Sequence, residues 1–299
     1  MTEKSFYSTN ENNCIIALGF FDAVHLGHKQ VIGECVNIAK EKGLQNAVFT
    51  FKSNPSNFFG KSERLICTFD ERKNLFNALG VDVVISAPCD EKFFSMSPKE
   101  FLSTLVNKIK VVGIVCGYDY TFGKNGLGNV DTLIDFCDKN NIFLKVVDKI
   151  ESLGDKISSR NIRKFIDCGE IEKANFLLGR NYSISGVVRK GRGDGKKSLF
   201  PTINVDYPCD KQIPNSGVYA TKTVIDGVKY NCVTNVGSHP TYNDFSENVE
   251  TYVIDFDKDI YGENVTIEFV KKLRDISKFE STDALKMQIE QDITIAREL

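Results

Sequence analysis

Two of the chain's three histidines, His25 and His28, stand three positions apart in the stretch GFFDAVHLGH, which begins at Gly19. An imidazole ring donates hydrogen bonds and carries charge near neutral pH, so paired rings can face the same phosphate. Gly27, between them, lets backbone approach a ligand closely. The alternative is two ordinary loop histidines, one of them packed. Their type, spacing and place directly after the apolar run CIIAL favour an anion site.

A second candidate site lies in the stretch GRGDGKKSLFPTINV, residues 191–205. Glycine-rich backbone with basic side chains can wrap phosphate oxygens, which singles out Gly191, Gly195 and Lys196. A mobile, lysine-bearing hairpin loop explains the pattern equally well, and both interpretations stay open.

The composition is that of an ordinary soluble globular protein. The 299 residues are 41% hydrophobic and 26% charged, and this length favours two domains. A formal net charge of -2 gives no support for a nucleic-acid or membrane partner, and we expect neither. The start MTEKSFYSTN is unlike a signal peptide, and no apolar run approaches ~20 residues. The nine cysteines contain no CxxC pair, which favours reduced thiols and a cytoplasmic location.

The first half of the chain alternates apolar runs with helical patterns. CIIAL (14–18) is expected to be a buried strand, and residues 28–43 place apolar side chains at helical spacing. NAVFTF follows as the next strand, and the order repeats through DVVIS, VVGIVCG and IFLKVVD. This alternation predicts a Rossmann-like, doubly wound α/β domain with a parallel sheet, whose ligands bind at the carboxyl ends of the strands. The histidine stretch follows such an end and opens a helix, whose first N–H groups favour anions.

After Gly179 the pattern changes to alternating β-strands. Runs such as SISGVV, GVYATKTVI, VKYNCVTNVG and NVTIEFVKKL are separated by turn signals, for example at Asp226–Gly227. They predict a compact antiparallel barrel or sandwich that ends in a C-terminal helix. The helical stretch from Ser158 to Gly179 closes the first domain, so we expect domains at 1–181 and 182–299.

Long stretches of both halves resemble one family. GFFDAVHLGH, CGYDYTFGKNGLGN (116–129) and ISSRNIRKFIDCGEIEKANFLLGR (157–180) are similar to the HxGH nucleotidyltransferases. FPTIN, NVGSHPTY and NVETYVIDF resemble riboflavin kinase stretches, and the whole chain resembles the bacterial bifunctional riboflavin kinase/FAD synthetases. The resemblance implies that riboflavin and ATP give FMN, and that FMN and ATP then give FAD, with Mg²⁺ required in both steps.

For the first half, the resemblance implies direct transfer of AMP from Mg-ATP to the phosphate of FMN, with pyrophosphate as leaving group. His25 and His28 are implied to stabilise the growing negative charge on the ATP phosphates. Ser158, Ser159 and Arg163 are implied to approach the pyrophosphate, although both serines also suit a helix N-cap. The other nucleotide- and flavin-binding positions implied are Gly19, Phe20, Asp22, Gly27, Asn54, Gly117, Asp119, Phe122 and Gly123.

For the second half, Thr202 and Asn204 are implied as oxygen ligands of Mg²⁺, a hard cation that prefers such ligands. Glu250 is implied as the base that takes the proton from the ribityl 5′-hydroxyl of riboflavin as that oxygen attacks the γ-phosphate of ATP. The alternative for Glu250 is a solvent-facing residue on an alternating strand. The third histidine, His239, is expected to be structural or to lie on the surface.

Departures from the family's usual residues fall in both halves. Asn54 stands before Pro55 where a His-Pro pair is usual, and Arg160 stands where Thr is usual. Ser198–Leu199 replaces Leu-Gly, which puts a side chain where backbone would approach phosphate, and Lys196 replaces Arg. Two alternatives therefore stay open: only the adenylyltransferase half is active, or the chain is a catalytically impaired flavin- or nucleotide-binding regulator. The sequence does not predict an oligomeric state.

Overall fold

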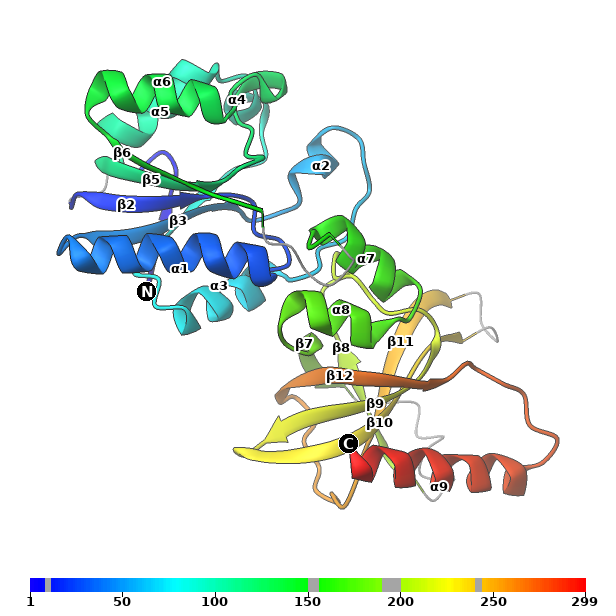
Figure 1. The fold of residues 1–299 in the computed structure, drawn as a ribbon. Coiled ribbons are helices and arrows are strands. Elements are labelled where there is room, and N and C mark those ends of the chain that lie inside the picture. Colours follow the sequence, from blue (N-terminus) through cyan, green and yellow to red (C-terminus); the bar gives the residue numbers. More distant parts are fainter. Residues whose placement is uncertain (9–11, 150–155, 190–199, 240–243) are drawn as a thin grey trace. The chain divides into compact units, whose positions relative to one another are not determined.

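A computed structural model of the chain describes residues 1–8, 12–149, 156–189, 200–239 and 244–299. Its contacts divide the chain into two compact units, Met1–Ser159 and Arg160–Leu299. The first unit contains a parallel sheet, and the second contains a closed antiparallel barrel (Figure 1). The predicted fold class is confirmed, and the closed barrel decides between the two β architectures that the sequence left open. The predicted domains 1–181 and 182–299 were assigned by expected activity, whereas these units are defined by contacts. The domain bounds therefore stay a prediction.

The first unit is organised around a 6-stranded parallel sheet in the spatial order β1-β4-β3-β2-β5-β6. Its strands are Thr2–Ser5 (β1), Cys14–Leu18 (β2), Gln45–Phe51 (β3), Val83–Ala87 (β4), Val111–Gly117 (β5) and Phe143–Val147 (β6). The chain runs from β2 to β3 on one side and later returns to β5 on the other side of β2. The carboxyl end of β2 is therefore a topological switch point, where doubly wound folds bind ligands.

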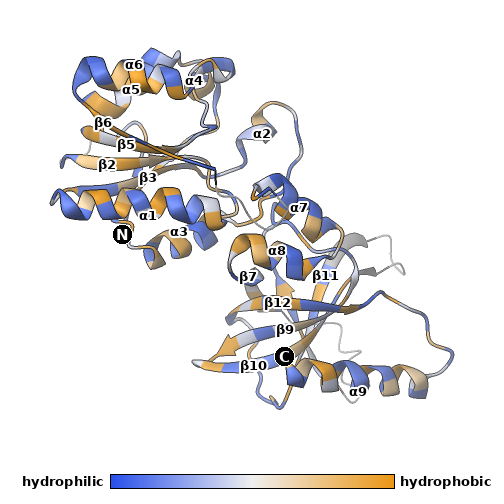
Figure 2. Ribbon diagram, viewed as in Figure 1, coloured by the Kyte–Doolittle hydropathy of each residue, from blue (hydrophilic) through white to orange (hydrophobic). Residues whose placement is uncertain are grey.

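Helices cover both faces of this sheet (Figure 1). The helices of this unit are Leu26–Glu41 (α1), Pro55–Phe58 (α2), Phe69–Ala78 (α3), Glu91–Phe94 (α4), Pro98–Asn107 (α5) and Val130–Asn140 (α6), with a 3-10 turn at Lys124–Gly126 (η1), and the short α2 lies in a loop beside the sheet. All residues of β2 are buried: Ile15 and Ala17 pack in the core below α1 and α3, and Ile16 in the core below α5 and α6. Figure 2 accordingly shows hydrophobic strands beneath helices of mixed character.

The second unit is built on a closed barrel in the order β10-β11-β8-β7-β12-β9, and its pairings are antiparallel. Its strands are Tyr182–Arg189 (β7), Thr202–Asp206 (β8), Gly217–Ile225 (β9), Val228–His239 (β10), Asp244–Val253 (β11) and Asn264–Arg274 (β12). Two strands, β1 in the first unit and β8 here, lie outside those that the sequence predicted.

Three helices accompany the barrel: Ser159–Asp167 (α7), Ile171–Leu178 (α8) and Thr282–Glu298 (α9). The predicted helical stretch from Ser158 to Gly179 is two helices, because the chain turns at Gly169 with a φ of 74°. α8 packs on β7 and β12, and α9 packs on β9 and β10. Asp292 of α9, 2% exposed, forms an ion pair with Arg274 of β12 at 2.9 Å. No helix in the described part of the chain is long and apolar enough to cross a membrane.

Candidate functional site

The turn between β2 and α1 has an enforced shape. A Cβ on Gly19 would lie 2.6 Å from the ring of Phe21, so any larger residue there would force that ring to move. Phe21 and Val24 adopt positive φ angles of 54° and 42°, which are strained for residues with side chains. Strain of this kind persists only where the surrounding structure enforces it, and it gathers at functional sites. The turn lies at the switch point of the sheet, where a ligand is expected.

His25 and His28 lie at the start of α1, where the first backbone N–H groups of a helix have no intrahelical acceptors. His25 is the N-cap, and its Nδ1 accepts a hydrogen bond from the backbone N–H of His28 at 3.2 Å. Because Nδ1 is the acceptor, the proton of a neutral His25 ring sits on Nε2. The two rings stack with centroids 3.5 Å apart. This arrangement suits a phosphate anion.

The neighbours of the two histidines support this arrangement. Asp22 is 2% exposed, and its Oδ1 accepts a hydrogen bond from the backbone N–H of Ile66 at 3.1 Å. Its carboxylate thus ties the turn to the segment that precedes α3. A Cβ on Gly27 would lie 3.2 Å from the ring of His25, so glycine leaves room for the stacked ring. The predicted contacts of Asp22 and Gly27 with a nucleotide stay predictions.

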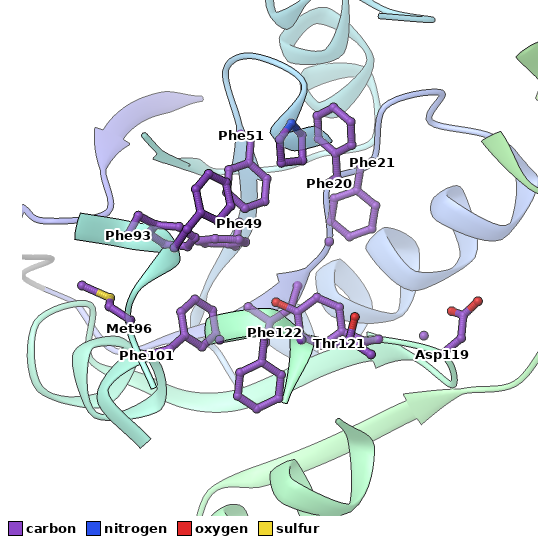
Figure 3. Close-up of a pocket in the computed structure, with 18 of the residues that line it drawn as sticks. Phe20, Phe21, Phe49, Phe51, Phe93, Met96, Phe101, Asp119, Thr121 and Phe122 are labelled. Atoms are coloured by element: carbon purple, nitrogen blue, oxygen red, sulfur yellow. The ribbon is translucent and has the colours of Figure 1, made fainter. Parts of the chain in front are cut away.

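A cavity of about 700 Å³ opens beside this turn. Its wall comes from the segments that follow β2, end β3 and follow β5, together with α4 and α5 (Figure 3). The structure brings these sequence-predicted residues together in the wall: Gly19, Phe20, His28, Gly117, Asp119, Phe122 and Gly123. The cavity therefore lies at the carboxyl ends of the central strands, as the fold class leads one to expect.

Much of the remaining wall is aromatic, and the sequence analysis did not predict it. This phenylalanine wall consists of Phe49, Phe51, Phe59, Phe93, Phe94 and Phe101. Figure 3 shows Phe93 and Phe101 on one side of the cavity and Asp119 on the opposite side. Tyr120 also lines the cavity, and burial raises the pKa of its hydroxyl, which keeps the phenol neutral. Such a wall suits a large, flat, uncharged ring system.

The segment after β5 is fixed by close packing. Gly123 has a φ of 73°, and a Cβ there would lie 2.8 Å from the backbone nitrogen of Pro98. The next residue, Lys124, donates its backbone N–H to the carbonyl of Met96 at 2.7 Å. The ring of Phe122 stacks on that of Tyr120 with centroids 5.7 Å apart. These contacts hold the segment against the loop between α4 and α5.

Asn54 lies beside the cavity but is engaged within its own loop. Its side chain is 4% exposed and caps α2, because its Oδ1 accepts a hydrogen bond from the backbone N–H of Ser56 at 3.0 Å. Its Nδ2 donates to the carbonyl of Glu63 at 3.4 Å. The following Pro55 lines the cavity. These bonds give Asn54 a structural role, and its predicted contact with nucleotide stays a prediction.

The serine-arginine stretch lies at the start of α7. Ser158 precedes this helix and Ser159 is its first residue. Arg163, one turn further, donates from its guanidinium to Oε1 of Gln212 at 3.2 Å, inside the second unit. Gln212 also donates to Asp167 of the same helix. The predicted contact of these residues with pyrophosphate stays a prediction.

In the barrel, the predicted kinase residues share one face of β8 and β11. Asn204 lies directly opposite Glu250, and the hydroxyl of Thr202 donates to Oε1 of Glu250 at 2.7 Å. Asn204 is 7% exposed, and its Oδ1 accepts a hydrogen bond from Nδ2 of Asn248 at 2.9 Å. Glu250 is half-buried and bonded within this cluster, which is unlike a simple solvent-facing position. The structure thus brings Thr202, Asn204 and Glu250 together.

This oxygen cluster fits a hard cation. Within the described residues there is no group of three His, Cys, Asp or Glu side chains that could hold a metal, so a cation here would rely on hydroxyl, amide and phosphate oxygens. Mg²⁺ accepts such sets because it keeps several waters and binds substrate phosphates. A second cavity, of about 240 Å³, borders Thr202 and the segment after β11. The predicted phosphate loop, with Gly191, Gly195, Lys196 and Ser198–Leu199, lies outside the described residues.

Two family models match the chain, one in each half. Residues 7–161 match FAD synthetase, and residues 178–299 match riboflavin kinase. Similar proteins named bifunctional riboflavin kinase/FMN adenylyltransferase span nearly the whole chain. One from Bacillus subtilis is 38% identical over 93% of this chain and 90% of its own length. One from Haemophilus influenzae is 36% identical over 95% of this chain and 93% of its own length.

A solved structure also matches the full length. It is a crystal structure described as a macrolide-efflux protein from Streptococcus pneumoniae, with a TM-score of 0.91 and 27% identity over 99% of both chains. The parallel sheet, the barrel and their order along the sequence are thus shared with a known structure. Taken with the two matched halves, the comparisons show that this chain belongs to the family of bifunctional riboflavin kinase/FMN adenylyltransferases.

Proposed function

We propose that this chain phosphorylates riboflavin to FMN and then adenylylates FMN to FAD, with ATP as the second substrate of both reactions. The observation that carries the first-unit reaction is the stacked histidine pair at the N-terminus of α1, with His28 in the wall of the aromatic cavity. The same proposal assigns adenylyl transfer to residues 1–181 and riboflavin phosphorylation to residues 182–299, in the cytoplasm.

In the adenylyl transfer, the phosphate of FMN attacks the α-phosphorus of ATP and pyrophosphate leaves. His25 donates from Nε2, and His28 donates from its ring, to the phosphate oxygens, on which negative charge grows. The phenylalanine wall stacks against the flavin ring and keeps water away from it. Because no covalent intermediate with the protein is needed, the rate depends on positioning and on charge stabilisation.

In the riboflavin kinase reaction, Glu250 accepts the proton of the ribityl 5′-hydroxyl as this oxygen attacks the γ-phosphate. Thr202 and Asn204 would hold Mg²⁺, which neutralises phosphate charge when bound. The hydrogen bond from Thr202 to Glu250 supports this assignment, because it directs the threonine lone pairs away from the carboxylate. A metal there would therefore meet oxygen rather than a hydroxyl proton.

The proposal is tested by incubating the purified full-length chain with riboflavin, ATP and Mg²⁺ and separating the flavins by chromatography. We expect FMN to form first and FAD to follow, with ADP and pyrophosphate released in step. Omission of Mg²⁺ should stop both reactions. If neither flavin product forms with oxidised or with reduced riboflavin, the proposed function is wrong.

A further inference from the structure

Arg72 is an arginine in the core of the first unit. It lies on α3 and is 0% exposed, and it is the largest fully buried side chain among the residues that the structure describes. Nη1 donates to the carbonyl of Phe20 at 3.2 Å and to the hydroxyl of Thr50 at 2.6 Å. Nη2 donates to the carbonyls of Phe51 and Lys52 at 2.7 and 3.2 Å. A cation is rarely buried so completely unless it is hydrogen-bonded, and here Nη1 and Nη2 donate to three backbone carbonyls and one hydroxyl.

These bonds join two turns that build the cavity. Phe20 follows β2, and Phe51 ends β3, so the guanidinium bridges the carboxyl ends of two neighbouring strands. The hydroxyl of Thr50 adds a bond of its own to the carbonyl of Phe20, at 2.6 Å. The guanidinium lies over the ring of Phe20, with its Cζ 5.1 Å from the ring centroid. Both Phe20 and Phe51 belong to the cavity wall (Figure 3).

The turn after β2 needs such support. Its residues Phe21 and Val24 hold positive φ angles, and strained backbone of this kind relaxes when the contacts that enforce it are removed. The Phe20 carbonyl, next to this strain, is fixed by two donors, Arg72 and Thr50. Loss of the hydrogen bonds from the Arg72 guanidinium would free the turn to adopt other arrangements. In those arrangements the cavity wall and the start of α1 would no longer fit one ligand.

We propose that Arg72 is a positioning residue for FMN adenylylation: it holds the turns of Phe20 and Phe51 in the single arrangement that binds substrate. The inference rests on the proposed adenylyltransferase function of this cavity. Arg72 contacts backbone and Thr50 rather than reacting atoms, so its effect on the reaction passes through the shape of the cavity.

The proposal has a kinetic signature that separates positioning from folding. If the turn is in its binding arrangement only part of the time, the apparent affinity for FMN falls by that fraction, because binding must select the right arrangement. The bound complex is then normal, so KM rises while kcat is unchanged. A merely structural role gives the opposite result: fewer folded molecules lower the maximal rate, and those that remain keep the normal KM.

The test measures FAD formation from supplied FMN and ATP by full-length Arg72→Lys and Thr50→Val. Lysine keeps the charge but lacks the two Nη groups that donate side by side. We expect KM for FMN to rise about tenfold, with kcat within about twofold of the value for the unaltered chain. Valine keeps the shape of Thr50 without its hydroxyl, and we expect a rise of about threefold. If Arg72→Lys does not fold, Thr50→Val still tests the positioning role.

Thr223→Val is the matched control, because the Thr223 hydroxyl is buried with no hydrogen-bond partner among the described residues. Its KM should equal that of the unaltered chain. An unchanged KM in Arg72→Lys and Thr50→Val, or a lowered kcat at unchanged KM, would overturn the positioning role. Failure of the unaltered chain to make FAD from FMN would instead refute the proposed function itself.

Discussion

We propose that His25 has two tasks, one for each nitrogen of its ring. Nδ1 caps α1 by accepting from the N–H of His28, so the proton of a neutral ring is on Nε2. The first task is structural and the second chemical. A side chain that keeps only the cap can therefore separate them.

We expect His25→Asn and His25→Ala to differ in stability but not in activity. Asparagine is a good N-cap, so the free energy of unfolding should stay near that of the unaltered chain, whereas alanine should lower it by about 1 kcal/mol. Both variants lack the Nε2 donor, and FAD formation should fall about 100-fold in each. Denaturant unfolding and initial rates provide the two measurements. Normal FAD formation by His25→Asn would show that the ring only caps the helix.

The cysteines differ in their access to solvent and in the ease with which they ionise. Burial raises the pKa of the Cys35 and Cys116 thiols to about 12, so almost no thiolate exists at pH 8. Cys168 and Cys209 are exposed. We expect a thiol reagent to label these two first in the folded protein and the buried ones only after unfolding. Rapid labelling of Cys116 in the native protein would contradict the described core.

At the scale of elements, the segment after β5 illustrates how backbone shape controls the cavity. Gly123 and Gly126 both have positive φ angles, but they differ in their surroundings. A Cβ on Gly123 would meet the Pro98 backbone at 2.8 Å, whereas on Gly126 it would meet only the Thr121 side chain at 3.7 Å. The two positions thus form a natural pair for comparison.

Gly126→Ala should lower the free energy of unfolding by about 1 kcal/mol, the usual cost of the left-handed conformation. Gly123→Ala should lower it by at least about 2 kcal/mol, because the Pro98 backbone must also move. The displaced segment should raise KM for FMN in Gly123→Ala. Thermal unfolding of both variants, followed by kinetics, checks this order. If both variants lost the same free energy of unfolding, the Pro98 backbone would be able to move at no measurable cost.

Most elements were predictable because each carries its own periodic signal. The runs CIIAL, NAVFTF and VVGIVCG are buried on both faces and appear as β2, β3 and β5. β1 escaped prediction because the sequence TEKS is short and polar, and it forms only by pairing with β4 at the sheet edge. Its stability comes from the neighbouring strand, which no local pattern encodes.

The candidate site was predictable only where a motif is contiguous. The histidine pair and the segment after β5 were found this way, and the structure places His28, Asp119 and Phe122 in one cavity wall. The phenylalanine wall is assembled from β3, α4, α5 and the loop after α2, so its members share no spacing along the chain. Arg72 gave no signal either, because an arginine on a short helix normally faces water.

At the scale of the whole molecule, the two units carry the two proposed sets of reacting groups. The first has imidazoles at a switch point, and the second has a carboxylate, a hydroxyl and an amide on a barrel face. Since Glu250 and His28 belong to different units, the two activities should be removable one at a time.

Glu250→Gln should remove only riboflavin phosphorylation. Glutamine can still accept the hydrogen bond from Thr202, but it cannot take a proton, so FMN formation should fall at least about 100-fold. FAD formation from supplied FMN should be unchanged, which is the internal control for folding. Unimpaired FMN formation would show that another group is the base.

The most direct measurement follows both products in time with His28→Ala, given riboflavin, ATP and Mg²⁺. Alanine retains the backbone N–H that His25 accepts, so the start of α1 should stay capped and the unfolding transition unchanged. We expect FMN to accumulate at the normal rate while FAD stays undetected, because the adenylyl transfer has lost a side chain that donates hydrogen bonds to the phosphate oxygens. FAD formation at the unaltered rate, or equal loss of both products in a folded protein, would contradict the account.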